Sequence, residues 1–466
     1  MSTPRKLFGT DGVRGHAGEY PLDRATVARL GAALVRAMRP STTSAQGPST
    51  ASGQGAGEDA TPIRFVVGRD TRESGEWIEQ ELARGAGSEG ARVTSAGVIP
   101  TPAIAYVTPV MGFDAGIVIS ASHNPFQDNG IKVFSGKGEK FTESLEREVE
   151  AIVARPDWSV PASATATLDK TNVIDEYSAH ARQILPDAGP LRGMKLAIDT
   201  ANGATTTVAP TLFADLGFDL QVLSATPNGR NINLDCGSTH PQHLSDAVRE
   251  RGARMGVAFD GDGDRAIFVD ASGRVVDGDA VLLMCARHLK ATGRLTGDAI
   301  VATVMSNIGL EIALRESGID LVRCPVGDKY VMEEMVKRGL ALGGEQSGHI
   351  IFSEHLFTGD GIATALCVLR VMAETGRELS DLASELVTYP QILVNVRVRE
   401  KKALESVPEI AAEMARVEKQ LAGHGRLLVR YSGTEPLLRV MLEGKDQDEI
   451  QRWATDIAGK VKELLG

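Results

Sequence analysis

The distribution of apolar and polar residues predicts strands and helices that alternate along most of the chain. Apolar runs of strand length occur at 63–67, 115–119, 195–198 and 256–259. Other apolar residues recur at helical spacing, as in the segment before Pro40 with Val27, Leu30, Leu34 and Met38. Strands that alternate with amphipathic helices are typical of α/β architecture, and we predict that fold class here.

The C-terminal segment has a different pattern. Apolar residues alternate with other residues at Ile392, Val394, Val396 and Val398. Further strands are predicted at 427–429 and 437–442. A helical stripe then follows at Ile450, Trp453, Ile457, Val461 and Leu464. Strands with one apolar face and helices to cover it predict a small α+β domain.

The length of the chain indicates several domains. Its 466 residues suffice for about three or four domains of roughly 100–150 residues each. We expect them at 1–157, 158–259, 260–375 and 376–466. Within the first, residues 41–62 are mostly Ser, Thr, Ala, Gly and Pro, so we predict a disordered surface insertion, which a domain tolerates because loop-closure cost grows slowly with length.

Composition narrows the class of protein. The net charge of −11 argues against a nucleic-acid binder, because neutralising phosphates needs a basic face. The sequence contains no run of 18 or more apolar residues, so we expect no membrane span. The N-terminal segment lacks the apolar stretch of a signal peptide, so we do not expect one. The four cysteines are scattered without metal-type spacing, which favours reduced thiols in a cytoplasmic protein.

Candidate chemistry begins where the apolar run 115–119 stops. It leads into Ser120–Pro125, which puts the Ser122 hydroxyl on a tight turn at the end of a buried strand, where α/β sheets present ligand-contacting groups. The alternative is a turn serine that bonds its own backbone, with His123 as a structural histidine. Lys132, ten residues after Ser122, is by itself compatible with a solvated surface residue.

A second strand, 256–259, runs into three aspartates that alternate with glycines: Asp260, Asp262 and Asp264. Three carboxylates so close repel one another unless they converge on a hard divalent cation. A calcium loop of the EF-hand type is excluded, because Arg265 and Ala271 stand where that loop needs Gly and Glu. The neighbouring Arg265 suits the neutralisation of a transferring phosphate.

Two later loops carry ligand-binding residue types. Residues 343–349 combine glycines with Glu345, Ser347 and His349, which suit sugar hydroxyls, although such a segment can be only a polar turn. Residues 430–436, with Arg439 beyond them, offer guanidinium groups, hydroxyls and free backbone N–H groups to an anion such as phosphate. No nucleotide P-loop motif is present.

These four loops, in this order, resemble those of the α-D-phosphohexomutase family, and the resemblance covers nearly the whole chain. Its closest likeness is to the bacterial branch that acts on glucosamine phosphates. The segments that carry this likeness are Phe8–Gly15, Ile119–Pro125, Asp128–Lys132, Asn231–Asn233, Cys236–His240 and the loop around Gln346. The resemblance implies an α/β fold of four domains, three similar mixed α/β sheet domains followed by a smaller α+β C-terminal domain.

The resemblance also implies roles for particular residues. Ser122 would carry a phosphoryl group, and Asp260, Asp262 and Asp264 would hold one Mg²⁺ per subunit together with a phosphoserine oxygen. Four further residues would line the catalytic centre: Arg14, Lys132, Arg265 and His349. Substrate would be bound by Lys329, Glu345, Ser347, Arg430, Ser432, Gly433, Thr434 and Arg439. The proton acceptor would be Lys132, if neighbouring cations lower its pKa, or His349.

The implied activity is an isomerisation of glucosamine 6-phosphate to glucosamine 1-phosphate through a bisphosphosugar, which would feed UDP-N-acetylglucosamine and cell-wall precursor synthesis. A glucose 1,6-bisphosphate-type activator and a monomer or homodimer are compatible with it. The nearest alternative is a phosphomannomutase or phosphoglucomutase of the same family. A phosphatase would not need the loop at 430–434, and a binding protein would need neither Ser122 nor the aspartates. Thr200 and Lys329 depart from the family pattern, where Cys and Arg are commoner.

Overall fold

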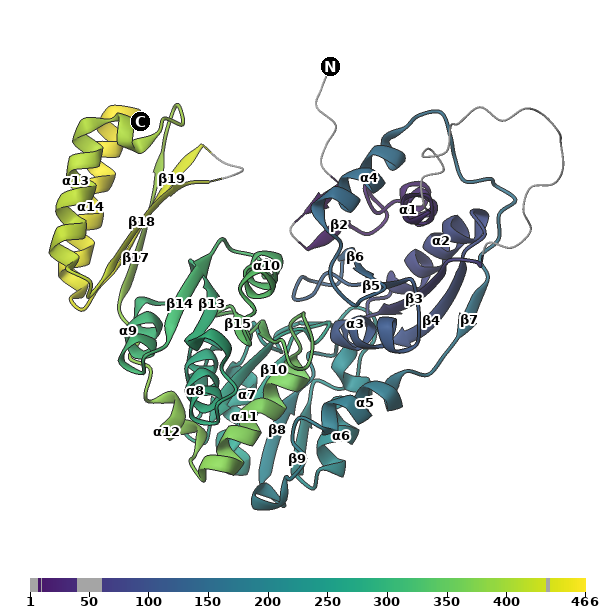
Figure 1. The fold of residues 1–466 in the computed structure, drawn as a ribbon, viewed down its shortest axis with the longest axis horizontal. Helices are drawn as coiled ribbons and strands as arrows, with labels where there is room; N and C mark the ends of the chain where they lie inside the picture. The colour runs from purple at the N-terminus through teal and green to yellow at the C-terminus, as the bar shows by residue number, and fades with distance from the viewer. Residues whose placement is uncertain (1–6, 10, 40–60, 433–435) are drawn as a thin grey trace. The chain divides into compact units, whose positions relative to one another are not determined.

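The computed structural model describes residues 7–9, 11–39, 61–432 and 436–466. The chain forms two compact units, Met1–Val304 with Val322–Ala383, and Met305–Leu321 with Ser384–Gly466 (Figure 1). Nearly all of the predicted insertion at 41–62 lies outside the described residues. Among the described helices, none is both long and apolar enough to cross a membrane.

The first sheet has seven strands in the order β1-β2-β6-β5-β3-β4-β7. The strands are β1 (Phe8–Gly9), β2 (Gly12–His16), β3 (Arg64–Arg69), β4 (Arg92–Val98), β5 (Ala115–Ile119), β6 (Asp128–Ser135) and β7 (Leu168–Lys170). β5 and β4 both pair with β3 in parallel, and β7 pairs with β4 in the same sense. β6, β2 and β1 add antiparallel strands at the β5 edge. The strands expected from the apolar runs at 63–67 and 115–119 are confirmed.

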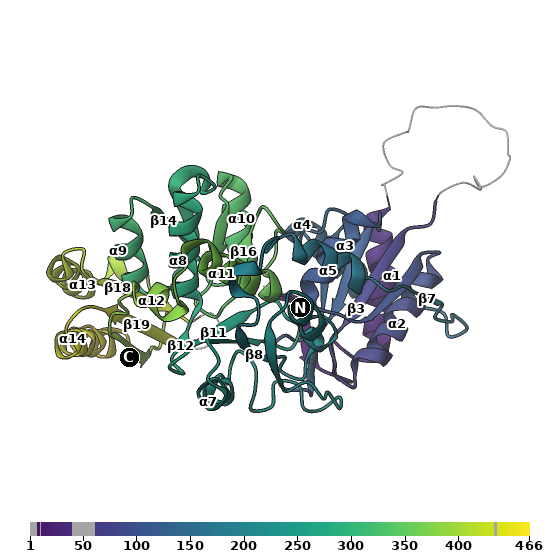
Figure 2. The same ribbon diagram turned by 90° about the horizontal axis from the view of Figure 1, so that it is seen from below.

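Helices cover both faces of this sheet. The helices are α1 (Arg24–Met38), α2 (Gly75–Ser88), α3 (Thr101–Val110) and α4 (Glu143–Ala154). α1, α2 and α4 pack on the face that carries Phe65, Val67 and Ile117. On the opposite face α3 approaches so closely that a Cβ at Gly116 would lie 2.2 Å from the Thr108 hydroxyl. Figure 2 shows α1 and α2 on one side of the sheet and α3 on the other.

The second sheet has the order β12-β11-β10-β8-β9. Its elements are α5 (Ile174–Arg182), β8 (Lys195–Asp199), α6 (Ala209–Asp215), β9 (Asp219–Leu223), α7 (Gln242–Arg251), β10 (Met255–Phe259), β11 (Ala266–Asp270) and β12 (Val275–Val276). β10 pairs in parallel with β8 and antiparallel with β11. The expected boundary between 259 and 260 therefore divides a hairpin, and the aspartate loop belongs to the second sheet instead of opening the third domain.

The third sheet has the order β14-β13-β15-β16. The elements of this region are α8 (Gly278–Ala291), β13 (Ala299–Thr303), β14 (Asp320–Cys324), α10 (Asp328–Arg338), β15 (Leu342–Gly344), β16 (Ile350–Phe352), α11 (Gly361–Thr375) and α12 (Leu379–Ala383). Short 3₁₀ turns occur along the chain at Gly189–Leu191, Ala204–Thr207, Thr296–Asp298 and Leu404–Ser406. β13 and β15 are parallel, and β16 returns antiparallel to β15.

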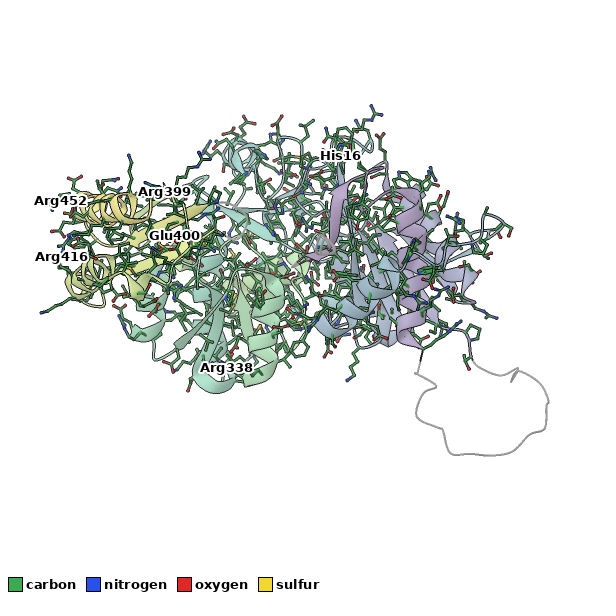
Figure 3. The ribbon with its side chains drawn as sticks, turned by 90° about the horizontal axis from the view of Figure 1, so that it is seen from above. His16, Arg338, Arg399, Glu400, Arg416 and Arg452 are labelled. Atoms are coloured by element: carbon green, nitrogen blue, oxygen red, sulfur yellow. The ribbon has the colours of Figure 1, made fainter. Side chains whose placement is uncertain are left out.

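The second unit contains the predicted α+β domain. Its elements are α9 (Ile308–Glu316), β17 (Gln391–Arg397), α13 (Pro408–Leu421), β18 (Arg426–Tyr431), β19 (Leu437–Glu443) and α14 (Gln447–Leu465). The sheet is antiparallel, in the order β17-β19-β18, and Leu438, Val440 and Leu442 of β19 pack in one core with residues of α13 and α14. Arg416 and Arg452 lie on these two helices and are exposed (Figure 3). The expected fold class, three mixed α/β sheet domains and a smaller α+β domain, is confirmed.

A buried carboxylate joins α5 to α11. The Tyr177 hydroxyl donates to the Asp360 carboxylate at 2.9 Å, and Asp360 also accepts the Ala363 N–H at the start of α11. Burial raises the pKa of Asp360 to about 6, although these two hydrogen bonds lower it. The folded state therefore favours the protonated acid. Protonated Asp360 therefore contributes to the free energy of unfolding. This contribution is complete below the ordinary pKa of 3.8 and is lost as the pH rises through about 6.

Asp360→Asn is therefore expected to stabilise the fold at pH 8 relative to wild type, by at most about 3 kcal/mol, and much less at pH 5. Asparagine keeps the oxygen that caps α11 but cannot ionise. The thermal unfolding midpoints of both proteins at the two pH values measure this difference. An equal offset between the proteins at both pH values would contradict the prediction.

Candidate active site

Ser122 lies three residues after the end of β5 and is almost completely buried. Its hydroxyl donates to Asp260 Oδ2 at 2.5 Å, and His123 Nδ1 lies 3.3 Å from Ser122 Oγ. The backbone N–H of Ser122 donates to Ser120 Oγ at 2.9 Å. The sequence also allowed a turn serine whose hydroxyl bonds its own backbone. The Ser122 hydroxyl instead donates to a carboxylate of another domain, so this alternative is excluded.

The three aspartates converge as the sequence predicts. Asp260, Asp262 and Asp264 are buried on the loop between β10 and β11, and each offers an oxygen within 4.8 Å of those of the other two. Asp262 Oδ1 has no hydrogen-bond partner among the described residues. Burial, together with Asp264 and Asp262, raises the pKa of Asp260 well above its usual range. Such a group of buried carboxylates fits a hard divalent cation, which would relieve their mutual repulsion.

Lys132 stands among carboxylates. Its Nζ lies 2.8 Å from Asp262, 3.0 Å from Asp264 and 3.0 Å from Asp11. Burial lowers the pKa of Lys132, but these three neighbours outweigh it and raise that pKa well above its ordinary value. The condition on which Lys132 was a candidate base, a pKa lowered by neighbouring cations, is therefore not met. In this arrangement Lys132 is a permanent cation.

Two arginines and a neutral histidine lie beside the serine. Arg14 donates to the Ala121 carbonyl at 3.3 Å, and the Arg265 backbone N–H donates to Asp260 Oδ1 at 3.1 Å. Burial and the charges of Arg265 and Arg14 lower the pKa of His123 to about 4. His123 is therefore an uncharged imidazole near neutral pH, while the two guanidinium groups supply positive charge.

His349 lies between two carboxylates of different loops. Its Nδ1 is 3.6 Å from Asp264 Oδ1 and its Nε2 is 3.7 Å from Asp328 Oδ2. Burial lowers the pKa of His349, but the two carboxylates outweigh it, and the net shift is upward. Its Nε2 also accepts the Gly359 backbone N–H at 3.0 Å, which places the ring proton on Nδ1, toward Asp264.

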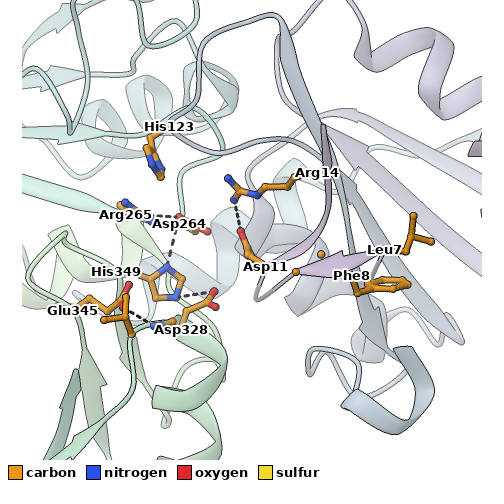
Figure 4. Close-up of a pocket in the computed structure, with 14 residues that line it drawn as sticks. Leu7, Phe8, Asp11, Arg14, His123, Asp264, Arg265, Asp328, Glu345 and His349 are labelled. Carbon is orange, nitrogen blue, oxygen red and sulfur yellow. Dashed lines mark hydrogen bonds and ion pairs between the residues drawn. The ribbon is translucent and has the colours of Figure 1, made fainter. Parts of the chain in front are cut away.

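Some of these groups line a cavity of about 560 Å³ beside Ser122 (Figure 4). The described side chains that line it come from the first sheet, the aspartate loop, the start of α10 and the loop after β15. They include Asp11, Arg14, His123, Asp264, Arg265, Asp328, Glu345 and His349. The volume suits a hexose phosphate. Six of the 14 described lining residues are carboxylates or arginines.

The expected sugar-binding residues differ in their surroundings. Glu345 lines the cavity and accepts the Gly327 N–H at 3.1 Å, while Ser347 is exposed on the same loop. Gln346 turns elsewhere and donates to Asp277 at 3.0 Å. Lys329 is buried, and its Nζ lies 2.9 Å from Glu146 Oε2, outside the lining of this cavity. The structure therefore brings Glu345 to the site but directs the Lys329 side chain into an ion pair.

Three further residues join the site that the sequence did not single out as site residues. Asp11 bonds Arg14, Lys132 and Lys140, and Lys140 also pairs with Asp328. Asp11 lies within a segment that carries the family likeness, which was the available signal for it. Asp328 directly precedes Lys329, an expected substrate-binding residue, which was the available signal for it. Lys140 had no comparable signal, because its partners are remote in sequence.

The predicted phosphate-binding residues belong to the second unit. Arg430 of β18 stands directly opposite Arg439 of β19, on the sheet face turned away from the Leu438 and Val440 side chains. Two guanidinium groups on one face can both donate to an anion. Ser432 is buried next to them, whereas Gly433 and Thr434 lie outside the described residues.

Comparison with known proteins places all four segments in one family. The profiles described as phosphoglucomutase/phosphomannomutase, alpha/beta/alpha domains I, II and III match residues 5–159, 175–273 and 277–389, and that of the C-terminal domain matches residues 393–460. The phosphoglucosamine mutase of Solibacter usitatus is 48% identical, covering 99% of each chain. That of Moorella thermoacetica is 47% identical over 96% of this chain and 97% of its own.

Solved structures share the fold at lower identity. A phosphoglucomutase/phosphomannomutase family protein of Burkholderia thailandensis superposes with a TM-score of 0.77 at 24% identity, over 98% of this chain and 97% of its own. The open form of parafusin, a phosphoglucomutase from Paramecium, gives a TM-score of 0.76 at 16% identity, over 99% and 96%. At these identities the likeness concerns the fold.

Proposed function

Because this chain belongs to the phosphoglucomutase/phosphomannomutase family, we propose that it interconverts glucosamine 6-phosphate and glucosamine 1-phosphate. Family membership makes the chain an isomerase of the phosphohexomutase type. The choice of amino sugar is supported by relatives named phosphoglucosamine mutases that are 44–48% identical over nearly the full length. A phosphomannomutase or phosphoglucomutase of the same family is the alternative activity.

The observation that carries the proposal is the contact between Ser122 and Asp260 inside the carboxylate group. Ser122 is the proposed phosphate carrier. It gives its phosphate to the free hydroxyl of the sugar, and after the bisphosphosugar turns around, the other phosphate returns to Ser122. Asp260, Asp262 and Asp264 would hold Mg²⁺, which would neutralise charge on the transferring group. Reaction through a free hydroxyl and a phosphoserine requires no other co-reactant.

The chain's own cations and one histidine complete the proposed chemistry. Arg265 and Arg14 line the cavity beside Ser122 and can neutralise phosphate oxygens, which a loose phosphoryl-transfer transition state requires. Lys132 and His349 are the two candidates for accepting the proton of the attacking sugar hydroxyl. Lys132 would first have to give up its own proton, and His349 Nε2 would have to give up its hydrogen bond from the Gly359 N–H. Glu345 offers a carboxylate to the sugar hydroxyls.

The proposal extends to the setting of the enzyme. We place it in the cytoplasm, as a monomer or homodimer that feeds amino-sugar precursors for the cell wall, and expect a glucose 1,6-bisphosphate-type compound to rephosphorylate Ser122. We keep the four proposed domains but end the second after β12, because the β10–β11 hairpin belongs to one sheet.

The grip on the second phosphate is assigned to Arg430, Ser432 and Arg439 with Gly433 and Thr434. Arg430→Ala is expected to raise KM for the sugar phosphate roughly 10- to 100-fold, because a charge-assisted hydrogen bond is worth about 1.5–3 kcal/mol. The variant should also release bisphosphosugar, so added glucose 1,6-bisphosphate should partly restore its rate.

Arg416→Ala, which removes an exposed arginine of the same unit that pairs with Glu413, is the matched control and should keep the wild-type KM. Steady-state kinetics with and without the activator measure both effects. A wild-type KM in Arg430→Ala without any need for activator would remove the loop from substrate binding and favour the phosphatase alternative.

The test of the proposed function is a coupled assay of purified, phosphorylated protein on the 6-phosphates of glucosamine, glucose and mannose. We expect the highest kcat/KM with glucosamine 6-phosphate and no stoichiometric release of inorganic phosphate. A clear preference for glucose or mannose phosphate would establish the alternative mutase activity. Sustained release of inorganic phosphate would establish a phosphatase.

A further inference from the structure

Ser122 has a backbone conformation that serine rarely adopts. Its φ is +51°, in the left-handed region that favours glycine. A non-glycine residue persists there only when the surrounding structure holds it. The turn is tight as well, because the Asn124 N–H donates to the Ala121 carbonyl at 3.1 Å.

Two side chains donate to the same pair of carbonyl oxygens in this turn. Arg72 Nη2 lies 3.1 Å from the Ser122 oxygen and 2.6 Å from the Asn124 oxygen. Asn233 Nδ2 lies 2.9 Å from the first oxygen and 3.1 Å from the second. Each donor therefore bridges both carbonyls, and together they form what we call the Ser122 clamp, Arg72 and Asn233.

Arg72 is itself firmly held. It follows β3, whose carboxyl end lies beside that of β5 in the parallel pair, and only 1% of it is exposed. Its Nη1 pairs with the buried Asp70 carboxylate, and its backbone N–H donates to Asp70 Oδ1 at 2.9 Å. With its charge compensated on that side, Arg72 directs Nη2 to the two carbonyls.

Asn233 comes from the domain of the second sheet. It has a φ of +58°, its N–H donates to the Ala201 carbonyl at 2.9 Å, and it is buried. The aspartate loop meets it at Gly261, where a Cβ would lie 2.6 Å from the Ser122 carbonyl oxygen and 2.8 Å from Asn233 Nδ2. Only glycine at position 261 leaves room for both the Ser122 carbonyl and the Asn233 amide. The aspartate loop and the Ser122 clamp therefore enclose the same carbonyl.

We propose that Arg72 and Asn233 are positioning residues for phosphoryl transfer, which hold the Ser122 peptide so that its side-chain oxygen faces the aspartate loop. This inference rests on the proposed function, in which Ser122 carries the phosphate. Neither side chain contacts the Ser122 hydroxyl or lines the described part of the cavity. Rotation of that peptide would move the oxygen out of line, and misplacement by about 1 Å can cost roughly 10²-fold in rate.

The main variant is Asn233→Gly, which removes the donor but keeps a residue suited to a positive φ. We expect kcat to fall roughly 10- to 100-fold while KM changes by less than about threefold. Intact mass should still show one phosphate on the protein, and the thermal midpoint should stay close to wild type. This division between kcat and KM separates positioning from loss of substrate binding.

Arg230→Ala is the matched control. Arg230 lies on the same segment, and its Nε is 2.8 Å from Glu73 Oε2 of the first domain, so it also links the two domains, but it does not touch the Ser122 turn. We expect this variant to keep the wild-type kcat. If the loss came only from weaker contact between the two domains, kcat would fall by the same factor in Asn233→Gly and Arg230→Ala.

Arg72→Lys completes a double-mutant cycle with Asn233→Gly. Lysine keeps a charge for Asp70 but loses the planar fork. Because both residues act on one peptide, the double variant should lose less rate than the product of the two single losses.

Four outcomes would overturn the inference: a wild-type kcat in Asn233→Gly, equal losses in Asn233→Gly and Arg230→Ala, an Asn233→Gly defect confined to KM, or losses in the double-mutant cycle that multiply. If wild type itself shows no mutase turnover, the proposed function fails, and this inference fails with it. Mutase turnover in wild type together with a fully active Asn233→Gly refutes the clamp alone.

Discussion

Ser122→Ala is expected to lower mutase turnover by on the order of 10⁴-fold or more, the largest effect of any single replacement in this chain. Removal of the nucleophile of a covalent mechanism leaves only binding and charge stabilisation, which account for a small part of the rate. The Ser122 hydroxyl donates to Asp260, and alanine leaves no side-chain oxygen there to carry the phosphate. The variant should keep its fold, because the hydroxyl makes no contact with the apolar core.

Intact-mass measurement tests the same assignment independently of turnover. Wild type purified from cells or treated with glucose 1,6-bisphosphate should carry one added phosphate, and Ser122→Ala should carry none. Ser88→Ala, whose hydroxyl donates to the Gly85 carbonyl within α2, should be phosphorylated like wild type. Phosphate on another residue together with full activity of Ser122→Ala would refute the assignment.

The second large effect is expected from the metal ligands. Replacing a residue that hydrogen-bonds to a metal ligand typically lowers activity roughly 10- to 100-fold. Asp262→Asn removes the charge of a ligand itself, so we expect turnover to fall by more than that. Asp262 Oδ1 has no hydrogen-bond partner among the described residues, and we expect this oxygen to bind the cation. Calorimetric titration with Mn²⁺ should show weaker binding to this variant, and EDTA should stop wild-type turnover until Mg²⁺ is added.

Asp270→Asn is the control for loss of a buried carboxylate. Asp270 ends β11 of the same sheet and bonds Ser272 and Arg274 at the following turn, remote from the three aspartates in the loop before that strand. It should alter stability and leave Mn²⁺ affinity unchanged. Wild-type activity in excess EDTA, or equal Mn²⁺ affinity in Asp262→Asn and wild type, would show that the three aspartates do not bind the essential cation.

The tertiary structure corrected the predictions made from the sequence where residues that are remote in the chain come into contact. Lys132 lies among Asp11, Asp262 and Asp264, so its pKa rises instead of falling. The sequence contains the lysine but not the identity of its neighbours, which come from a short N-terminal hairpin and a loop of another sheet. For the same reason, the ion pair of Lys329 with Glu146 could not be anticipated.

The domain boundary at 259/260 was placed wrongly for a related reason. The apolar run at 256–259 ends at Asp260, and a change from apolar to acidic residues looks like a boundary. Strand pairing is a long-range property, and β10 pairs with β11 across this position.

The sequence by itself determined the α/β alternation, the strand that ends at Ser122 and the convergent aspartates, because hydrophobic period and local turn chemistry act over a few residues. β5 has the bounds that its apolar run predicts. Only the tertiary structure decided which groups surround Ser122. The carboxyl ends of β3, β5 and β10 bring Arg72, Ser122 and Asp260 together, because parallel strands of separate sheets open toward one site.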